Sequence, residues 1–182
     1  MSEAAPHDLP FDRALRRQRR DRAAAMPDDG ADWLVRRMEE ELLERLALVT
    51  RPFSHALVLG SGRGRLAHAL RGRGMEVVAA DAGRRFAEGA VQCDEDRLPF
   101  PPARFDLVVS AGVLDTVNDL PGALIQIRRA LRPDGLFLAA LWGAGSLPAL
   151  RAAMQAGEAA DGSDAAPRLH PQIDVRAAGD LL

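Results

Sequence analysis

The stretch that most constrains the fold is "ALVLGSGRGRLAHAL", residues 56–70, where an apolar run leads through alternate glycines into a helical pattern. This order is typical of a strand, a tight turn and a helix in an α/β sheet. Gly60, Gly62 and Gly64 permit left-handed backbone and leave room for a ligand near the main chain. The helix N-terminus would present free amides and a positive dipole end. The stretch predicts a ligand-binding turn, with a purely structural turn as the alternative.

The rest of the chain repeats this alternation of strand and helix. Further apolar runs occur at residues 76–81, 89–94, 105–113 and 136–142. They are continuous rather than alternating, as expected of parallel strands covered by helices on both faces. The chain therefore predicts a doubly wound, Rossmann-like α/β fold of five parallel strands in the order 3-2-1-4-5.

Helical patterns flank and connect these strands. They are expected at residues 8–25, 33–49, 65–74, 119–131, 146–160 and 174–182, with a loop at 161–172. The "RPDG" turn, with Pro133 and Gly135, closes the helix before the fifth strand. In the second helix an apolar face is formed by Trp33, Leu34, Met38, Leu42, Leu46 and Val49, and a charged face includes Glu39, Glu40 and Glu44. We expect an N-terminal helical segment (1–52), a core (53–145) and a helical and loop tail (146–182).

The first helix is rich in arginine. Residues 11–22 contain six arginines against two aspartates. Such a run could bind a polyanion or form the solvated face of a charged helix. Because no aromatic side chains interleave the arginines, the pattern favours the solvated face.

Composition excludes several classes of protein. The 182 residues carry a net charge of −2, which gives no global attraction to nucleic acid. No apolar run approaches the roughly 20 residues of a spanning helix, and the start lacks a secretory signal pattern. The lone Cys93 excludes an internal disulfide framework and a Cys-rich metal site. We expect a cytoplasmic protein without a transmembrane segment or a metal.

Charged residues after the glycine turn narrow its ligand. No Lys-Ser/Thr follows it, which excludes a P-loop, and Arg65 stands where a dinucleotide fingerprint has its third glycine. Asp81 ends the second strand and could accept both ribose hydroxyls, or it could simply cap a turn. Asp94 ends the third strand and could accept from an adenine amine. Because the carboxyl ends of neighbouring parallel strands share one edge, the three loops together favour a nucleoside.

At these positions the chain resembles the class I S-adenosylmethionine-dependent methyltransferases. The matching segments are "LVLGSGRG", "VVAAD", "CDEDRLPF", "FDLVVSAGVL" and "LRPDGLFLAAL". The resemblance implies S-adenosyl-L-methionine as cofactor. It places Gly60, Ser61, Gly62 and Gly64 around the amino-acid portion, Asp81 at the ribose, Asp94 with Glu95 at the adenine, and Ser110 and Ala111 toward the sulfonium. It names no catalytic residue.

A narrower resemblance extends over almost the whole chain. The start, the segment from residue 117 to 143 and the tail look like bacterial relatives of the mitochondrial complex I assembly factor that hydroxylates an arginine. This subgroup lies close to the malonyl-acyl-carrier-protein methyltransferases. The resemblance implies methyl transfer to a small molecule, an acyl-carrier-bound acid or a protein. The alternatives are protein arginine hydroxylation and a non-catalytic role in respiratory complex I assembly.

Three departures from the family pattern affect these expectations. Val58 stands where the family has an acid, and such a lost contact costs about 1–3 kcal/mol of binding. Leu114-Asp115-Thr116 replaces Leu-His-Trp, so a histidine base is absent there; Asp115 is either a partner for a cationic substrate or a solvated loop acid. The last two strands of the family fold are missing. We therefore expect a truncated chain, or one whose open edge at the fifth strand is covered by a partner.

Overall fold

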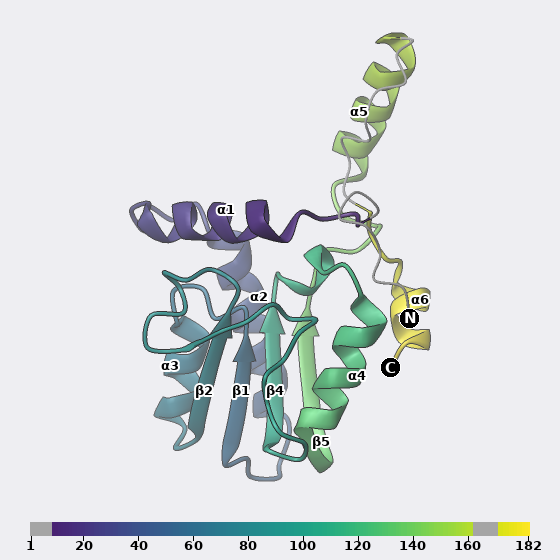
Figure 1. Ribbon diagram of the computed structural model, residues 1–182. Coiled ribbons are helices and arrows are strands. Elements are labelled where there is room, and N and C mark those ends of the chain that lie inside the picture. Colours follow the sequence, from purple (N-terminus) through teal and green to yellow (C-terminus); the bar gives the residue numbers. More distant parts are fainter. Residues whose placement is uncertain (1–8, 162–170) are drawn as a thin grey trace. The chain divides into compact units, whose positions relative to one another are not determined.

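The computed structural model describes residues 9–161 and 171–182. Parts of the expected first helix and of the loop at 161–172 therefore lie outside the described residues. Five parallel strands form one sheet in the order β3-β2-β1-β4-β5, which confirms the predicted fold class (Figure 1). The strands are β1 (His55–Leu59), β2 (Glu76–Asp81), β3 (Val91–Gln92), β4 (Phe105–Ala111) and β5 (Leu131–Ala140).

Of the helices in the described residues, two precede these strands, two lie between them in the chain and two follow them. They are α1 (Arg13–Ala25), α2 (Trp33–Ala47), α3 (Arg65–Gly72), α4 (Leu120–Ala130), α5 (Pro148–Asp161) and α6 (Val175–Asp180), with a 3-10 turn at Leu114–Thr116. The first helix begins at Arg13 rather than at residue 8, because the Asp12 carboxylate accepts the Leu15 amide at 3.0 Å and caps it.

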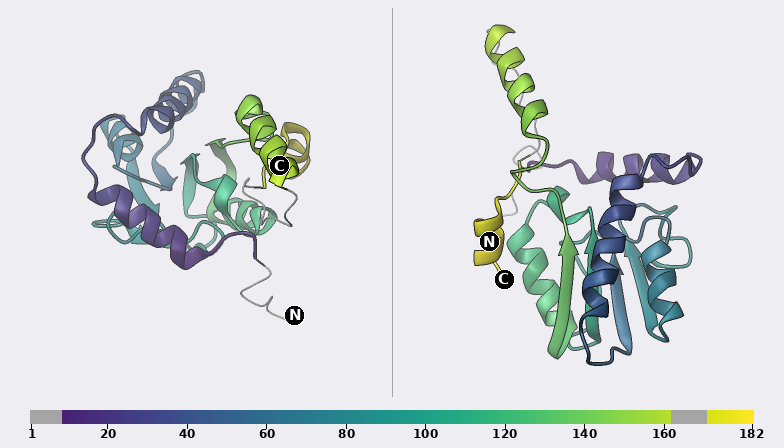
Figure 2. Two further views of the ribbon diagram at one scale, coloured as in Figure 1. Left: turned by 90° about the horizontal axis from the view of Figure 1, so that it is seen from above. Right: turned by 180° about the vertical axis from the view of Figure 1, so that it is seen from behind.

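The core consists of two apolar layers, one on each face of the sheet. Ala56 and Val58 of β1 pack with residues of α2 and α3, whereas Leu57 and Leu59 pack with residues of α4. Figures 1 and 2 show the resulting three layers, with α2 and α3 behind the sheet and α4 in front. This alternation explains why the strands read as continuous apolar runs: both of their faces are buried.

Two strands differ from their predicted extents. β3 is only two residues long, at Val91–Gln92, instead of spanning 89–94. β5 starts at Leu131, before the expected turn, and includes it as an irregularity. Phe105 pairs with Leu131, and Leu107 pairs with Leu136. Between these two pairs, β4 has one residue and β5 has four, so β5 bulges at this point. Asp134 has a left-handed φ of 62° there, so "RPDG" turns inside the strand.

The predicted faces of α2 are partly wrong. Leu42 and Leu46 are buried in the core, but Trp33 is 62% exposed and Leu34 is 37% exposed. Conversely, Glu39, which the pattern places on the charged face, is 8% exposed. Glu39 instead accepts a hydrogen bond at 3.0 Å from Nε of Arg65, the first residue of α3.

The described residues divide into two compact units, one up to Leu141 and one from Trp142 onward. In the second unit, the Ala144 amide donates to the Ile173 carbonyl at 2.9 Å and Arg151 hydrogen-bonds to Gln172. These contacts hold the segment at α5 and the segment at α6 to each other.

Candidate functional site

The glycine turn joins β1 to α3 at the carboxyl edge of the sheet. Gly60, Gly62 and Gly64 have φ angles of 72°, 50° and 77°, all left-handed. A Cβ atom on Gly60 would lie 2.5 Å from both γ-carbons of Val113, so this position has no room for any side chain. The amides of Gly60 and Ser61 both donate to the Ala80 carbonyl, at 2.9 and 3.0 Å. The turn is therefore fixed tightly against the end of β2.

Asp81 is fully buried beside this turn. Its Oδ2 accepts the Gly62 amide at 3.0 Å, and its Oδ1 accepts the Gly83 amide at 2.8 Å. Arg20 of α1 donates to both oxygens, from Nε to Oδ1 at 2.6 Å and from Nη2 to Oδ2. Asp81 thus lies where the sequence places a ribose ligand, and it accepts four hydrogen bonds from the chain itself.

Three consecutive acids follow β3 and also pair with α1. Arg17 donates to both oxygens of Asp94. The partners of Glu95 and Asp96 are Arg16, with Nη1 2.8 Å from Glu95 Oε2, and Arg13, with Nη2 2.7 Å from Asp96 Oδ2. All three acidic side chains are nearly inaccessible to solvent, with exposures of 2–4%.

The prediction that α1 presents a solvated arginine face is therefore wrong for four of its six arginines. Positions 13, 16, 17 and 20 share one helical face, and that face lies across the carboxyl edge of the sheet (Figure 1). Burial lowers the pKa of Arg16, but its hydrogen bond and charge interaction with Glu95 outweigh burial, so the pKa is raised. The binding partner of these arginines is the protein itself.

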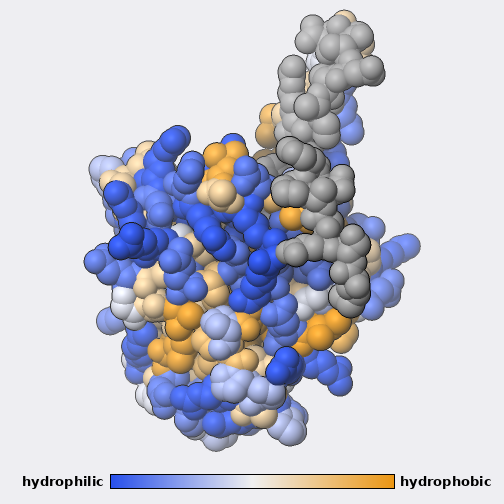
Figure 3. All heavy atoms as spheres, in the orientation of Figure 1, coloured by the Kyte–Doolittle hydropathy of each residue, from blue (hydrophilic) through white to orange (hydrophobic). Residues whose placement is uncertain are grey.

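Further hydrogen bonds hold both ends of α1. The Phe11 amide donates to Asn118 Oδ1 at 2.9 Å, and Asn118 Nδ2 donates back to the Phe11 carbonyl at 2.9 Å. At the other end, Arg63 Nη2 donates to the Met26 carbonyl at 2.9 Å. In the space-filling view, hydrophilic residues cover most of the region where α1 lies (Figure 3).

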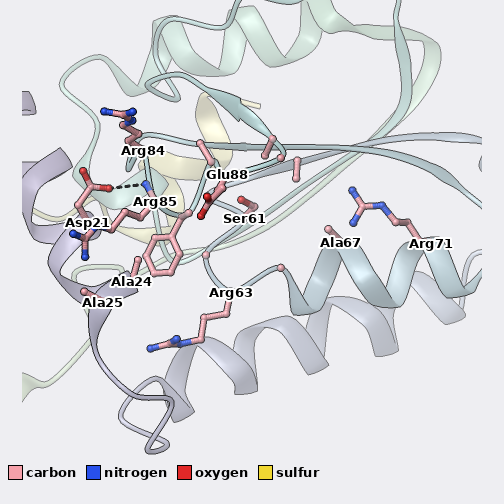
Figure 4. A pocket seen from close by; sticks show the side chains of 17 residues that line it. Asp21, Ala24, Ala25, Ser61, Arg63, Ala67, Arg71, Arg84, Arg85 and Glu88 are labelled. Atoms are coloured by element: carbon pink, nitrogen blue, oxygen red, sulfur yellow. Dashed lines mark hydrogen bonds between the residues drawn. The ribbon is translucent and has the colours of Figure 1, made fainter.

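Two cavities flank the glycine turn. The larger, about 1130 Å³, lies between α1, the turn and residues 84–90, and Figure 4 shows the Asp21 carboxylate accepting the Arg85 amide beside it. The smaller, about 260 Å³, is bounded by Gly60 and Gly62 of the turn, by Ala111 at the end of β4 and Gly112 after it, and by the start of α2. Neither cavity is lined by Asp81 or Asp94, because α1 covers both acids.

The smaller cavity contains an acidic cluster that sequence reasoning missed. Arg65 donates from Nε to Glu39 Oε2 at 3.0 Å and from Nη2 to Asp32 Oδ2 at 2.6 Å. Burial raises the pKa of Glu39 above its ordinary value, and the charge of Arg65 offsets part of this rise. Arg65 offered a signal, because it replaces a glycine at the start of a helix, but its acidic partners lie more than 25 residues earlier in the chain.

The remaining predicted site residues occupy different environments. Ser61 lines the larger cavity and Ala111 the smaller. Ser110 is fully buried, and its hydroxyl donates to the Leu59 carbonyl at 3.3 Å. Asp115 is half-buried in the 3-10 turn. The turn, Asp81, Asp94 and Ala111 therefore share one edge of the sheet, whereas the Ser110 side chain contacts the neighbouring strand.

The described residues include neither a metal-binding cluster nor a membrane-spanning helix. Among the described residues, no group of three or more His, Cys, Asp or Glu side chains is arranged to hold a metal ion. In the same part of the chain, no helix combines the length and apolar character that crossing a bilayer requires.

The sequence of this chain is similar to those of known proteins. Residues 57–139 match the family model of a methyltransferase domain. The human mitochondrial arginine-hydroxylase NDUFAF5 is 36% identical over 183 residues, which cover 94% of this chain and 53% of that protein. A malonyl-[acyl-carrier protein] O-methyltransferase from Methylovorus sp. is 35% identical over 163 residues, which cover 79% of this chain and 55% of that protein.

A solved structure carries the same fold. The 1,6-didemethyltoxoflavin-N1-methyltransferase of Burkholderia thailandensis, solved with 1,6-didemethyltoxoflavin and S-adenosylhomocysteine, superimposes with a TM-score of 0.56 at 25% identity. The match covers 80% of this chain and 68% of that one.

The fold and the glycine turn place the protein in the class of S-adenosylmethionine-dependent methyltransferase folds. More narrowly, residues 57–139 match the model of a methyltransferase domain, and the chain is similar to arginine-hydroxylase NDUFAF5 and to malonyl-acyl-carrier-protein methyltransferases. The resemblance inferred from the motifs is thus confirmed. The chain spans about half the length of the curated relatives it matches.

Proposed function

We propose that the chain binds S-adenosyl-L-methionine at the carboxyl edge of the sheet and acts as a methyltransferase. The observation that carries this proposal is the hydrogen bond from the Gly62 amide to Asp81 Oδ2, at 3.0 Å. It joins a left-handed glycine turn directly to the acid at the end of the next strand. In a doubly wound sheet this is the edge where ligands bind.

The residues on this edge fit the parts of the cofactor. The turn, with Gly60, Ser61, Gly62 and Gly64, would enclose the amino-acid portion, since no Cβ fills the space above Gly62 or Gly64. Asp81 would accept from the ribose hydroxyls, and Asp94 with Glu95 would lie at the adenine amine. Ala111 borders the cavity on the sulfonium side, with Ser110 supporting it from within the sheet.

Two acidic side chains near the turn could replace the acid that the family has at the position of Val58. Asp32 and Glu39 line the same small cavity as Gly60 and Gly62. An ammonium group at the amino-acid end of the cofactor would therefore meet carboxylates supplied by α2 and the loop before it, although β1 carries none.

When bound, the cofactor supplies a methyl group already activated on a positively charged sulfur. The chain's own contribution would be to hold the nucleoside, to align an acceptor with the methyl group and to exclude water. No side chain of the described residues is assigned as a general base. The acceptor would be a small molecule, an acyl-carrier-bound acid or a protein.

Calorimetric titration with S-adenosylhomocysteine tests the cofactor. We expect binding to the unmodified chain and at least a tenfold loss in Gly62→Ala, whose new methyl would enter the cradle. Gly74→Ala is the matched control, because Gly74 also has a left-handed φ, 86°, and open space, but lies between α3 and β2 at the opposite edge. Absence of heat with a folded circular dichroism spectrum, or equal losses in the two variants, would contradict the assignment.

The similarity to arginine-hydroxylase NDUFAF5 over 94% of the chain supports a second candidate, hydroxylation of a protein arginine. Candidate acceptors would be incubated with the protein, the cofactor, dioxygen and a chemical reductant, because hydroxylation consumes an oxidant that the cofactor does not supply. The mass of the acceptor then separates the two reactions. A gain of one methylene supports methyl transfer, and a gain of one oxygen supports hydroxylation. An unchanged acceptor despite cofactor binding would favour a non-catalytic assembly role.

A further inference from the structure

We propose that Arg17 and Arg20 of α1 set the cofactor affinity of this site by competing with the nucleoside for Asp94 and Asp81. On this view α1 is a displaceable occupant of the site. The nucleoside binds only after the arginine face of α1 has left the sheet edge. This inference rests on the proposed function and adds to it the residues that oppose binding.

The hydrogen-bonding capacity of Asp81 is already used. A carboxylate offers about four lone-pair sites. Two of those on Asp81 accept the Gly62 and Gly83 amides, and the other two accept Arg20. Ribose hydroxyls would need the second pair. Both oxygens of Asp94 are likewise held by Arg17, so an adenine amine would have to displace it.

Sterics reinforce this competition. A Cβ atom on Gly83 would lie 2.8 Å from Arg20 Cβ, so α1 packs against the backbone that follows Asp81. The Arg20 guanidinium lies 5.2 Å from the centre of the Phe86 ring. Because both cavities stop short of the two acids, a nucleoside cannot contact them while α1 is in place.

The attachment of α1 is polar and therefore reversible. No residue of this helix is buried, and Leu15 is 41% exposed. Detachment thus breaks ion pairs and a few hydrogen bonds without exposing an apolar face. The Arg17 side chain is 46% exposed and the Arg20 side chain 20% exposed, so the arginines can return to solvent, where guanidinium is stable. The acids would lose these partners, and a ligand that supplies new donors to Asp81 and Asp94 would replace the arginine hydrogen bonds.

The test compares charge-matched variants of α1 by titration with S-adenosylhomocysteine. Because apparent affinity falls with the fraction of open protein, the double variant Arg17→Gln/Arg20→Gln should bind about tenfold more tightly than the unmodified chain. The control Arg19→Gln/Arg22→Gln removes the same charge from two exposed positions of the same helix and should bind as the unmodified chain does. Equal or weaker binding by the double variant would overturn the inference.

Hydrogen exchange of the unmodified chain provides a second readout that needs no variant. With S-adenosylhomocysteine bound, amides of α1 should exchange faster than in the free protein, because the helix has been displaced. Slower exchange would show α1 closing over the ligand and would overturn competition. If no form of the folded protein binds the ligand, the proposed function itself fails. If the unmodified chain binds but the double variant has no higher affinity, only the competition by α1 fails.

Discussion

At the scale of single residues, Gly60 carries the strongest steric constraint in the turn. Gly60→Ala combines a left-handed φ with a contact of 2.5 Å to Val113. Gly89→Ala has nearly the same φ, 75°, but nothing within 4 Å of its Cβ. We expect Gly89→Ala to lower the free energy of unfolding by about 1 kcal/mol and Gly60→Ala by about 1–3 kcal/mol more. Urea titrations measure both; equal losses would contradict the close approach of the turn to Val113.

Cys93 provides a residue-scale test of the acidic edge. Burial, followed by the charges of Glu95, Asp94 and Asp81, raises the pKa of its thiol from 9.0 to about 12. The folded protein should therefore react very slowly with a thiol reagent at pH 8, and the chain unfolded in urea should react rapidly. Between pH 9 and 12 only the unfolded chain ionises this thiol, so stability should decrease as pH rises. Rapid reaction of the folded protein would contradict this environment.

At the scale of elements, α4 begins at a side-chain cap. The Asp119 carboxylate accepts the Gly122 amide at 2.8 Å, and Asp119→Ala should lower the free energy of unfolding of the core by about 1 kcal/mol. Asp174 caps α6 in the second unit in the same way, with the Arg176 amide at 2.8 Å. Asp174→Ala should leave the core transition unchanged. A core transition that responds equally to both substitutions would contradict the division into two units.

The elements also show what sequence patterns can and cannot predict. The positions of the strands followed from continuous apolar runs and glycine punctuation, which depend on local chemistry, and their order is the one typical of the doubly wound class. The role of α1 did not, because the partners of its arginines lie more than 60 residues away. A spacing of i, i+3, i+4 and i+7 for Arg13, Arg16, Arg17 and Arg20 was visible, but it shows only that these residues share a face. What that face contacts is a property of the folded sheet.

At the scale of the whole molecule, local acids and bases are arranged so that a nearly neutral chain has a strongly charged edge. Four acids at the carboxyl ends of β2 and β3 pair with four arginines of α1. Because their charges cancel, these pairs contribute nothing to the net charge of −2. Composition therefore predicts no global attraction to polyanions, but it could not reveal this internal pairing. The acidic cluster at Arg65 was hidden for the same reason, since Asp32 and Glu39 reach the turn from another helix.

The most direct test of the account is an NMR titration of the ¹⁵N-labelled chain with S-adenosylhomocysteine. The account predicts that the largest amide shifts occur at Gly60, Gly62 and Gly64, with further shifts at residues 81–83 and 94–96 and throughout α1. Shifts confined to other parts of the sheet, or no shifts at saturating ligand, would contradict a cofactor site at this edge.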